Sequence, residues 1–385
     1  MKKTLLTICL VWMCFSLSAQ KIIDLSGKWS FSIDRQDNGE KEKWFSHTLN
    51  DFINLPGSMP EKLKGDEVTA KTQWTGSLYD SSYYYNPYME KYRKEGNIKF
   101  PFFLTPDKHY VGAAWYQKEV NIPADWKGER ILLFLERPHI ETTVWVNGQK
   151  TGMQNSLCVP HQYDITRYVR PGKCTITIRV DNRIKEINVG PDSHSITDQT
   201  QGNWNGIVGR ICLQTTPKTY FDDIQIYPEP EQKLARVKVV TKGTGTAKVK
   251  LSAESFNTDK KHIVPAIQQE IKLNKGVTET EMVLPMGNDM LLWDEFHPAL
   301  YKLKAEVTNG KKTEIKEIQF GMRRFEIKGK WFYVNGRKTQ LRGTVENCDF
   351  PLTGYAPMDV ESWERVFRIC RSYGLNHMRF HSFCP

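Results

Sequence analysis

The sequence has few cysteines for its length and no long apolar run beyond its first 20 residues, and both shortages exclude classes of protein. Its eight cysteines are scattered through 385 residues without a C-x-x-C pair, which argues against a zinc site. A chain of this size can be stabilised by its core alone, so we expect mostly buried free thiols rather than a disulfide framework. We predict no transmembrane helix. We assign no metal site and no cofactor, and the sequence leaves metal dependence open.

Positive charge is not concentrated in any one stretch either. The net charge is +10, but basic residues alternate with acids, as in Lys41-Glu42-Lys43 and Glu314-Ile315-Lys316-Glu317. Nucleic-acid binding requires a basic patch or stripe, so we predict no nucleic-acid partner. Hydrophobic residues make up 39% of the chain and aromatic residues 12%, which is a globular composition.

The first 20 residues have the pattern of a secretory signal peptide. Lys2 and Lys3 precede an apolar run from Leu5 to Phe15, and small residues follow at 16–19. This run is too short to span a bilayer, and the small residues suit signal cleavage. We therefore predict a signal peptide at 1–20, a periplasmic or secreted protein, and no membrane insertion after cleavage.

Residues 21–219 alternate between polar and apolar side chains with the period of two that predicts β-strands. Ile131 to Leu135 is a continuous apolar run, which predicts a strand buried on both faces. Asn147-Gly148 predicts a tight turn after Val144-Trp145-Val146. The alternating positions include Trp29, Phe31, Ile33, Ile176, Ile178 and Val180. Short strands with this punctuation indicate a β-sandwich.

Residues 76–110 interrupt that pattern with seven tyrosines and three prolines. A loop of this length in a compact domain is usually functional or capping. Its rings could line a sugar site, or the segment could be a packed insert that covers a sheet edge; the sequence leaves both readings open.

A second β block covers residues 220–321. Tyr227-Pro228-Glu229-Pro230 is predicted to be a linker. Alternation recurs farther on, at Val237 and Val239, Val249 and Leu251, and Leu303, Ala305 and Val307. The block has the size of one immunoglobulin-like sandwich.

The pattern changes again over residues 322–385. A hairpin-like run from Phe325 to Lys338 contains Asn335-Gly336, and Gln340 to Gly343 is predicted to be a short buried strand. Asp359 is a good N-cap for a helix that Gly374 would end. A strand follows at 376–380, and strand, helix, strand is the opening of a parallel βα repeat.

The order and spacing of several motifs resemble glycoside hydrolase family 2, from about Asp24 to the last residue. They are Ala114-Trp115-Tyr116, Val144-Trp145-Val146-Asn147-Gly148, Tyr163-Asp164-Ile165-Thr166, Val180-Asp181-Asn182, Asn203-Trp204-Asn205-Gly206-Ile207, Arg342-Gly343 and Gly374-Leu375-Asn376-His377-Met378-Arg379-Phe380. The resemblance implies a mostly β chain: a jelly-roll sugar-binding domain, an immunoglobulin-like sandwich, and the first two βα units of a truncated (β/α)8 barrel.

The resemblance also implies an exo-acting, retaining glycosidase for terminal β-linked sugars, with secreted bacterial β-galactosidase-like members the most similar. Retention needs two carboxylates about 5–5.5 Å apart, which in this family are barrel glutamates, one of them in an Asn-Glu pair. The chain contains no Asn-Glu pair, and 322–385 is 64 residues against about 250 for a whole barrel. We therefore assign no catalytic residue and expect the chain alone to be inactive.

A non-catalytic carbohydrate-binding or scaffold protein is the alternative. Either interpretation predicts a carbohydrate partner, and neither decides whether the protein forms a homo-oligomer.

The resemblance suggests substrate-binding positions, although several depart from the family pattern. Glu346 and Asn347 stand where an Arg-His pair is usual, and Thr200 stands where an Asp is frequent. The predicted substrate-binding residues are Asp198, Asn203, Trp204, Arg342, Glu346, Asn347, Arg379 and His381.

Three of these residues could instead have a purely structural role. Trp204 could belong to the core, Glu346 could pair with Arg342, and His381 could be a structural residue at a strand end.

Overall fold

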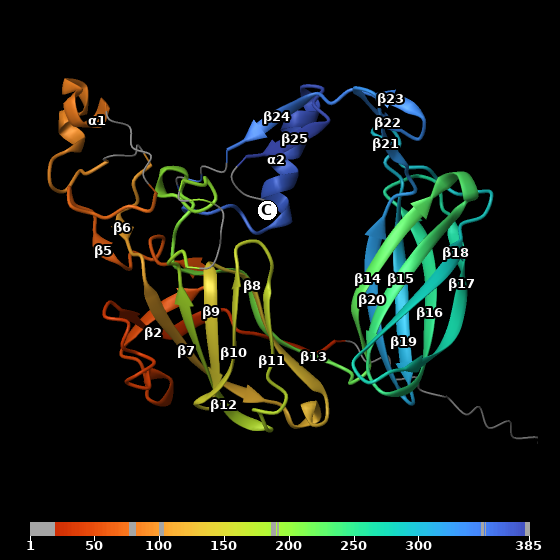
Figure 1. The fold of residues 1–385 in the computed structure, drawn as a ribbon, viewed down its shortest axis with the longest axis horizontal. Coiled ribbons are helices and arrows are strands. Elements are labelled where there is room, and N and C mark those ends of the chain that lie inside the picture. Colours follow the sequence, from red (N-terminus) through yellow and green to blue (C-terminus); the bar gives the residue numbers. More distant parts are fainter. Residues whose placement is uncertain are drawn as a thin grey trace, which may run out of the picture. The chain divides into compact units, whose positions relative to one another are not determined.

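The computed structural model describes residues 20–76, 82–99, 104–185, 190, 192–347, 350 and 352–381, so the predicted signal peptide lies outside the described residues except for Gln20. The described chain is mostly β (Figure 1). It divides into two compact units, each described by itself. The larger unit contains Lys21–Thr216 and most of the chain after residue 325, and the smaller contains Pro217–Phe325 with Val334–Gly336.

The larger unit is built on a sandwich of two antiparallel sheets. One sheet has the strand order β10-β9-β12-β7-β2-β3, and the other has β1-β13-β8-β11 with β4 beside β13. The strands are β1 (Ile22–Asp24), β2 (Gly27–Asp34), β3 (Asp51–Leu55), β4 (Gly57–Ser58), β7 (Ala113–Ile122), β8 (Arg130–Pro138), β9 (Ile140–Val146), β10 (Gln149–Ser156), β11 (His161–Asp164), β12 (Gly172–Asp181) and β13 (Gly206–Thr216).

Short elements lie between these strands. They are η1 (Trp44–Ser46), β5 (Asp66–Glu67), α1 (Ser82–Tyr85), η2 (Pro87–Tyr92), β6 (Lys108–His109), η3 (Ala124–Trp126) and η4 (Asp198–Thr200). The described part of the insert predicted at 76–110, residues 76, 82–99 and 104–110, thus holds two short helices and β6, which pairs with β5.

Side chains from both sheets form one core, as the period-two alternation predicts. Trp29 and Phe31 of β2 are fully buried, and so are the three alternating residues of β12, Ile176, Ile178 and Val180. The hairpin between β9 and β10 turns at Asn147-Gly148, where both residues have positive φ, 50° and 76°. Asparagine and glycine tolerate this conformation best, which is why the dipeptide is a reliable hairpin signal.

The smaller unit is a seven-strand sandwich with sheets β14-β15-β18 and β17-β16-β19-β20. All the residues predicted from alternation, among them Val237, Val249 and Leu303, are fully buried in its core. Its elements are β14 (Tyr220–Glu229), η5 (Pro230–Gln232), β15 (Leu234–Lys242), β16 (Gly245–Phe256), β17 (Ile263–Leu273), β18 (Val277–Pro285), β19 (Leu300–Asn309) and β20 (Lys312–Phe320).

The linker predicted at Tyr227–Pro230 is wrong. Tyr227 and Pro228 belong to β14 and pair with Arg236 and Ala235 of β15, and only Pro230 starts a turn. Proline lacks a donor N–H and is tolerated in an edge strand. Because β14 lies at the end of its sheet, Pro228 costs this strand little.

The chain after the smaller unit forms short strands and one helix. They are β21 (Phe325–Lys328), β22 (Trp331–Val334), β23 (Arg337–Thr339), β24 (Gly343–Glu346), α2 (Val360–Ser372) and β25 (His377–Phe380). The predicted helix is confirmed: the Asp359 side chain accepts a hydrogen bond from Ser362 N, and Gly374 has φ 77° just beyond the C-terminus. β24 and β25 pair in parallel.

The buried strand predicted at Gln340–Gly343 is wrong in position and burial. Strand pairing begins only at Gly343, and residues 340–343 are exposed. Apolar character at Leu341 suggested a core strand, but among the described strands β24 pairs with β25 alone.

Four cysteines lie among the described residues beyond the predicted signal peptide, and all four are free thiols. Cys174 and Cys212 are buried, Cys370 is half-buried and Cys158 is exposed. In the described part of the chain no helix is long and apolar enough to cross a membrane, and no group of three metal-ligating side chains is found.

Candidate functional site

The larger unit contains a cavity of about 400 Å³. One part of its wall comes from the sandwich and its loops: Arg137, His139, Leu157, Cys158, His194, Ser195, Thr200, Gln201, Gly202 and Trp204. The other part comes from the segment between β24 and α2, with Phe350, Tyr355 and Ala356, and from the end of β25, with Phe380 and His381. The cavity therefore joins residues more than 150 positions apart in the sequence.

Three neighbouring rings form one side of the cavity: the His139 ring is stacked on Trp204, and the Tyr355 ring is tilted at 44° to it. The indole of Trp204 lies 4.4 Å from the His139 imidazole at an angle of 25°, and 5.6 Å from the Tyr355 ring. Burial lowers the pKa of His139 to about 3, so this imidazole is neutral near pH 7. An aromatic wall of this kind suits the apolar C–H face of a sugar.

Tyr355 is held by a carboxylate outside the cavity lining. Its hydroxyl donates to Glu61 Oε2 at 2.9 Å, and burial, followed by this carboxylate, raises the tyrosine pKa. Glu61 also pairs with Lys62 at 2.7 Å. The phenol is thus fixed as a protonated donor to Glu61, with its ring against Trp204.

Two predicted binding residues, Asp198 and Asn203, are outside the cavity lining. Asp198 is only 6% exposed; one carboxylate oxygen accepts from Thr75 N at 2.5 Å, and the other lies 3.2 Å from His109 Nε2. Asn203 donates to Thr75 Oγ1 at 2.7 Å. Thr200, two residues after Asp198, does line the cavity, and its hydroxyl donates to His194 O at 2.5 Å.

His194, in the segment between β12 and β13, lies beside His381 at the end of β25. The Nδ1 atoms of His194 and His381 lie 3.2 Å apart, and both residues line the cavity. The backbone N–H of His381 donates to Glu346 O at 2.9 Å, which fixes the residue at the C-terminal end of β25. Of the predicted binding residues, the structure thus brings Trp204 and His381 together at one cavity.

The remaining four predicted binding residues do not line the cavity. Arg342 donates from Nε to Gly374 O at 2.9 Å and so ties the start of β24 to the end of α2. Glu346 is half-buried on β24, while Asn347 and Arg379 are exposed.

Sequence reasoning missed most of the wall, including the rings of His139, His194 and Tyr355. His139 directly follows Pro138, the last residue of β8, and a polar residue at a strand end was the one available signal. His194 and Tyr355 lie in irregular segments that carry no periodic pattern.

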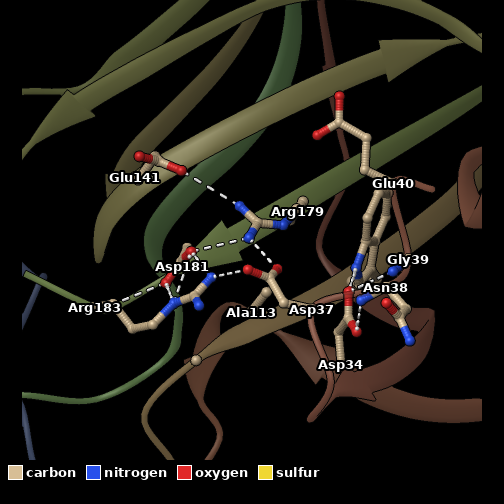
Figure 2. Close-up of polar contacts among 12 residues, drawn as sticks. Asp34, Asp37, Asn38, Gly39, Glu40, Ala113, Glu141, Arg179, Asp181 and Arg183 are labelled. Atoms are coloured by element: carbon tan, nitrogen blue, oxygen red, sulfur yellow. Dashed lines mark hydrogen bonds and ion pairs between the residues drawn. The ribbon is translucent and has the colours of Figure 1, made fainter. Parts of the chain in front are cut away.

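One cluster of acidic residues in the described sandwich lies elsewhere, in an ion-pair network on the six-stranded sheet (Figure 2). Arg179 contacts Asp37 at 2.6 Å, Asp181 at 2.9 Å and Glu141 at 3.3 Å. Burial alone would raise the pKa of Asp181, but hydrogen bonds from Arg183 and Lys185 hold it well below its usual value.

The same sheet face holds Asp34, which organises the segment after β2. Its carboxylate accepts from Asn38 N, Gly39 N and Trp115 Nε1, each within 2.9 Å (Figure 2). The carboxylates of Asp34, Asp37, Glu141 and Asp181 are thus all bound by groups of the chain itself. These contacts hold the segment after β2 on the sheet.

The cavity wall, by contrast, includes no aspartate or glutamate among the described residues. Glycoside hydrolysis with retention requires a pair of carboxylates about 5–5.5 Å apart. The described wall can therefore stack on and hydrogen-bond a ligand, but it does not supply the acid and the nucleophile of such a reaction.

Comparison with known proteins gives matches along most of the chain. The model for "Glycosyl hydrolases family 2, sugar binding domain" matches residues 22–217, and "Glycosyl hydrolases family 2" matches 219–323. A β-galactosidase of Thermoanaerobacter pseudethanolicus is 24% identical, with 74% of this chain and 38% of the relative aligned. Human β-glucuronidase is 24% identical, with 92% and 53% aligned.

A solved structure of similar fold is the apo β-glucuronidase of Ruminococcus gnavus. Its TM-score is 0.64 at 19% identity, with 94% of this chain and 55% of that chain covered. The chain spans about half the length, or less, of the relatives named here.

Proposed function

The chain belongs to glycoside hydrolase family 2, since the family models match residues 22–217 and 219–323. We therefore propose that it is the sugar-binding, N-terminal part of a secreted exo-glycosidase. The substrate proposed is a terminal β-linked sugar, with a β-galactoside the first candidate. The observation that carries the proposal is the cavity, whose aromatic wall faces residues at the end of β25.

The size and chemistry of the cavity support a single terminal sugar. About 400 Å³ is at the small end of the range for ligand sites, about 300–1,000 Å³. Trp204 offers a stacking surface, and Thr200 and Gln201 add polar groups beside it. One face for stacking and polar groups at the side are what a pyranose ring needs.

The catalytic carboxylates are proposed to come from the remainder of a (β/α)8 barrel that β24, α2 and β25 begin. β24 and β25 run parallel, and barrels build their active sites at the C-terminal ends of such strands. Phe380 and His381 occupy that end of β25 and line the cavity. The sandwich wall would then face the reacting carboxylates across the bound sugar.

This arrangement assigns the chain three tasks: stacking, orienting and excluding water. Trp204 would hold the ring plane, which sets the direction from which a nucleophile approaches the anomeric carbon. His139, neutral because it is buried, adds no charge to this wall. The neutral aromatic stack shields the sugar from water on that side.

A binding assay tests the proposal directly. The chain is titrated with methyl β-D-galactoside in a calorimeter, and the Trp204→Leu variant should bind about two- to tenfold more weakly, because a stacked ring contributes about 0.5–1.5 kcal/mol. Trp126→Leu is the matched control, because Trp126 is also buried, at 3% exposure against 6% for Trp204, but does not line the cavity. Absence of saturable binding to any β-linked hexoside, glucuronides included, would refute a sugar site.

A turnover assay separates binding from catalysis. The chain alone should release no nitrophenol from nitrophenyl β-galactoside, and clear turnover would show that the carboxylates are in this chain after all. A non-catalytic carbohydrate-binding protein is the second candidate, favoured by the absence of acids from the described wall. Reading the gene beyond codon 385 decides between them, since an open frame with an Asn-Glu pair supports the glycosidase.

Export is proposed from residues 1–20 alone. Mass spectrometry of the protein from its native host should find a mature N-terminus near residue 20. A full-length N-terminus beginning at Met1 would contradict secretion through a cleaved signal.

A further inference from the structure

The segment from Asn182 to Asn205, whose described residues are 182–185, 190 and 192–205, forms much of the wall of the sugar cavity. It connects β12, in the six-stranded sheet, with β13, in the opposite sheet. Six lining residues belong to it: His194, Ser195, Thr200, Gln201, Gly202 and Trp204. Their positions in the cavity thus depend on how the two ends of this crossover segment are held.

Asn182 joins the two ends directly. Its Nδ2 donates to Asn203 Oδ1 at 2.8 Å, although 21 positions separate the two residues. The same amide donates to Tyr110 O at 2.9 Å and accepts from Gly112 N at 2.8 Å. Asn182 is fully buried, so three hydrogen bonds satisfy an amide that has no access to water.

Asn205 fastens the second end to the same stretch of backbone. Its Nδ2 donates to Gly112 O at 2.9 Å and Val180 O at 3.0 Å. Its Oδ1 accepts from Tyr116 of β7 at 2.8 Å. Both ends of the crossover segment are therefore fixed on residues 110–116.

We propose that Asn182 is a positioning residue of the sugar cavity, acting through Asn203 to hold the crossover segment in its binding conformation; this rests on the proposed function. Holding the two ends of a segment together costs conformational entropy, and the hydrogen bond between Asn182 and Asn203 offsets part of that cost. Removing Asn182 would also leave buried groups at Tyr110, Gly112 and Asn203 without their partner, a cost that loosens the segment.

The test uses Asn182→Ala with Asn309→Ala as its matched control. Asn309 also bridges two segments, donating to Thr219 Oγ1 at 3.0 Å and Thr244 O at 2.8 Å, but it lies in the smaller unit. Hydrogen exchange is followed at Ile196, Gln201 and Gly202, whose amides donate within the crossover segment. Affinity for methyl β-D-galactoside is measured in parallel.

In Asn182→Ala these amides should exchange at least about fivefold faster, and affinity should fall about three- to tenfold. Asn309→Ala should change neither the exchange rates of these amides nor the sugar affinity by more than about twofold, even if it lowers the melting temperature as much as Asn182→Ala does. Unchanged exchange, or faster exchange with unchanged affinity, would overturn the proposal. A wild-type chain that binds no sugar refutes the proposed function instead, and exchange still decides whether Asn182 holds the segment.

If Asn182→Ala does not fold, Asn203→Ala replaces it. Asn203 is at the periphery of the network at 8% exposure, and its removal leaves the bonds from Asn182 to Tyr110 and Gly112 in place. The same faster exchange and weaker binding are expected, and their absence overturns the proposal equally.

Discussion

Replacing Asp198 tests whether this carboxylate is an internal anchor or a sugar ligand. The structure buries it to 6% exposure and uses both oxygens, one on Thr75 N at 2.5 Å and one beside His109 Nε2 at 3.2 Å. Hydrogen bonds to charged groups contribute about 1.5–3 kcal/mol each. Asp198→Ala should therefore lower the free energy of unfolding by about 2–4 kcal/mol.

Asp198→Asn is a milder substitution at the same position. An asparagine can still accept from Thr75 N through its Oδ1 and present its amide to His109, so about half of the loss should be recovered. The sugar affinity of Asp198→Asn should stay within about twofold of the wild type, since Asp198 does not line the cavity.

Urea unfolding monitored by tryptophan fluorescence is a suitable assay. Outside residues 1–20 the chain has ten tryptophans, and nine of them, all except Trp293, lie in the larger unit. The signal therefore reports on the unit that contains Asp198. The reasoning is refuted if Asp198→Ala unfolds at the wild-type urea concentration and loses sugar binding, because Asp198 would then be a ligand, as the sequence suggested.

Two further predictions concern the sandwich. Gly206→Ala should cost about 2–4 kcal/mol, because a Cβ there would lie 2.4 Å from Gly57 O at a φ of 149°; a wild-type melting temperature for this variant would contradict the geometry. Because the folded-state pKa of Asp181 is lowered, its contribution to stability is present above the unfolded pKa of about 3.9 and is lost as the pH falls below it. Asp181→Asn should therefore weaken the acid dependence of the unfolding free energy between about pH 4 and 2, and an unchanged slope would count against the ion-pair network.

Local patterns determine the parts of the fold that the sequence predicts well. Asn147-Gly148 predicts its hairpin because positive φ is needed at both positions. Asp359 predicts the start of α2 because its side chain accepts from Ser362 N. The alternation through Trp29 and Phe31 likewise follows from burial on one side of a strand.

Local sequence patterns do not predict features that depend on contacts with residues distant in the sequence. Pro228 looks like a linker residue, and only its place in an edge strand permits it within β14. Asp198 and Thr200 are two positions apart, yet one carboxylate turns to Thr75 and His109 while the threonine reaches the cavity. No periodicity distinguishes these orientations, because contacts 89 and 123 positions away decide them.

The crossover segment has a consequence for how this protein could diversify. Its ends are fastened by Asn182 and Asn205 to the sandwich, whereas Thr200 and Gln201, which face the cavity, are not members of the hydrophobic core. Substitutions at such loop positions can alter ligand preference while the scaffold keeps its stability. A library confined to these two positions would explore new sugar specificities, and it would also remove the hydrogen bonds that Thr200 donates to His194 O and that Gln201 accepts from Phe350 N.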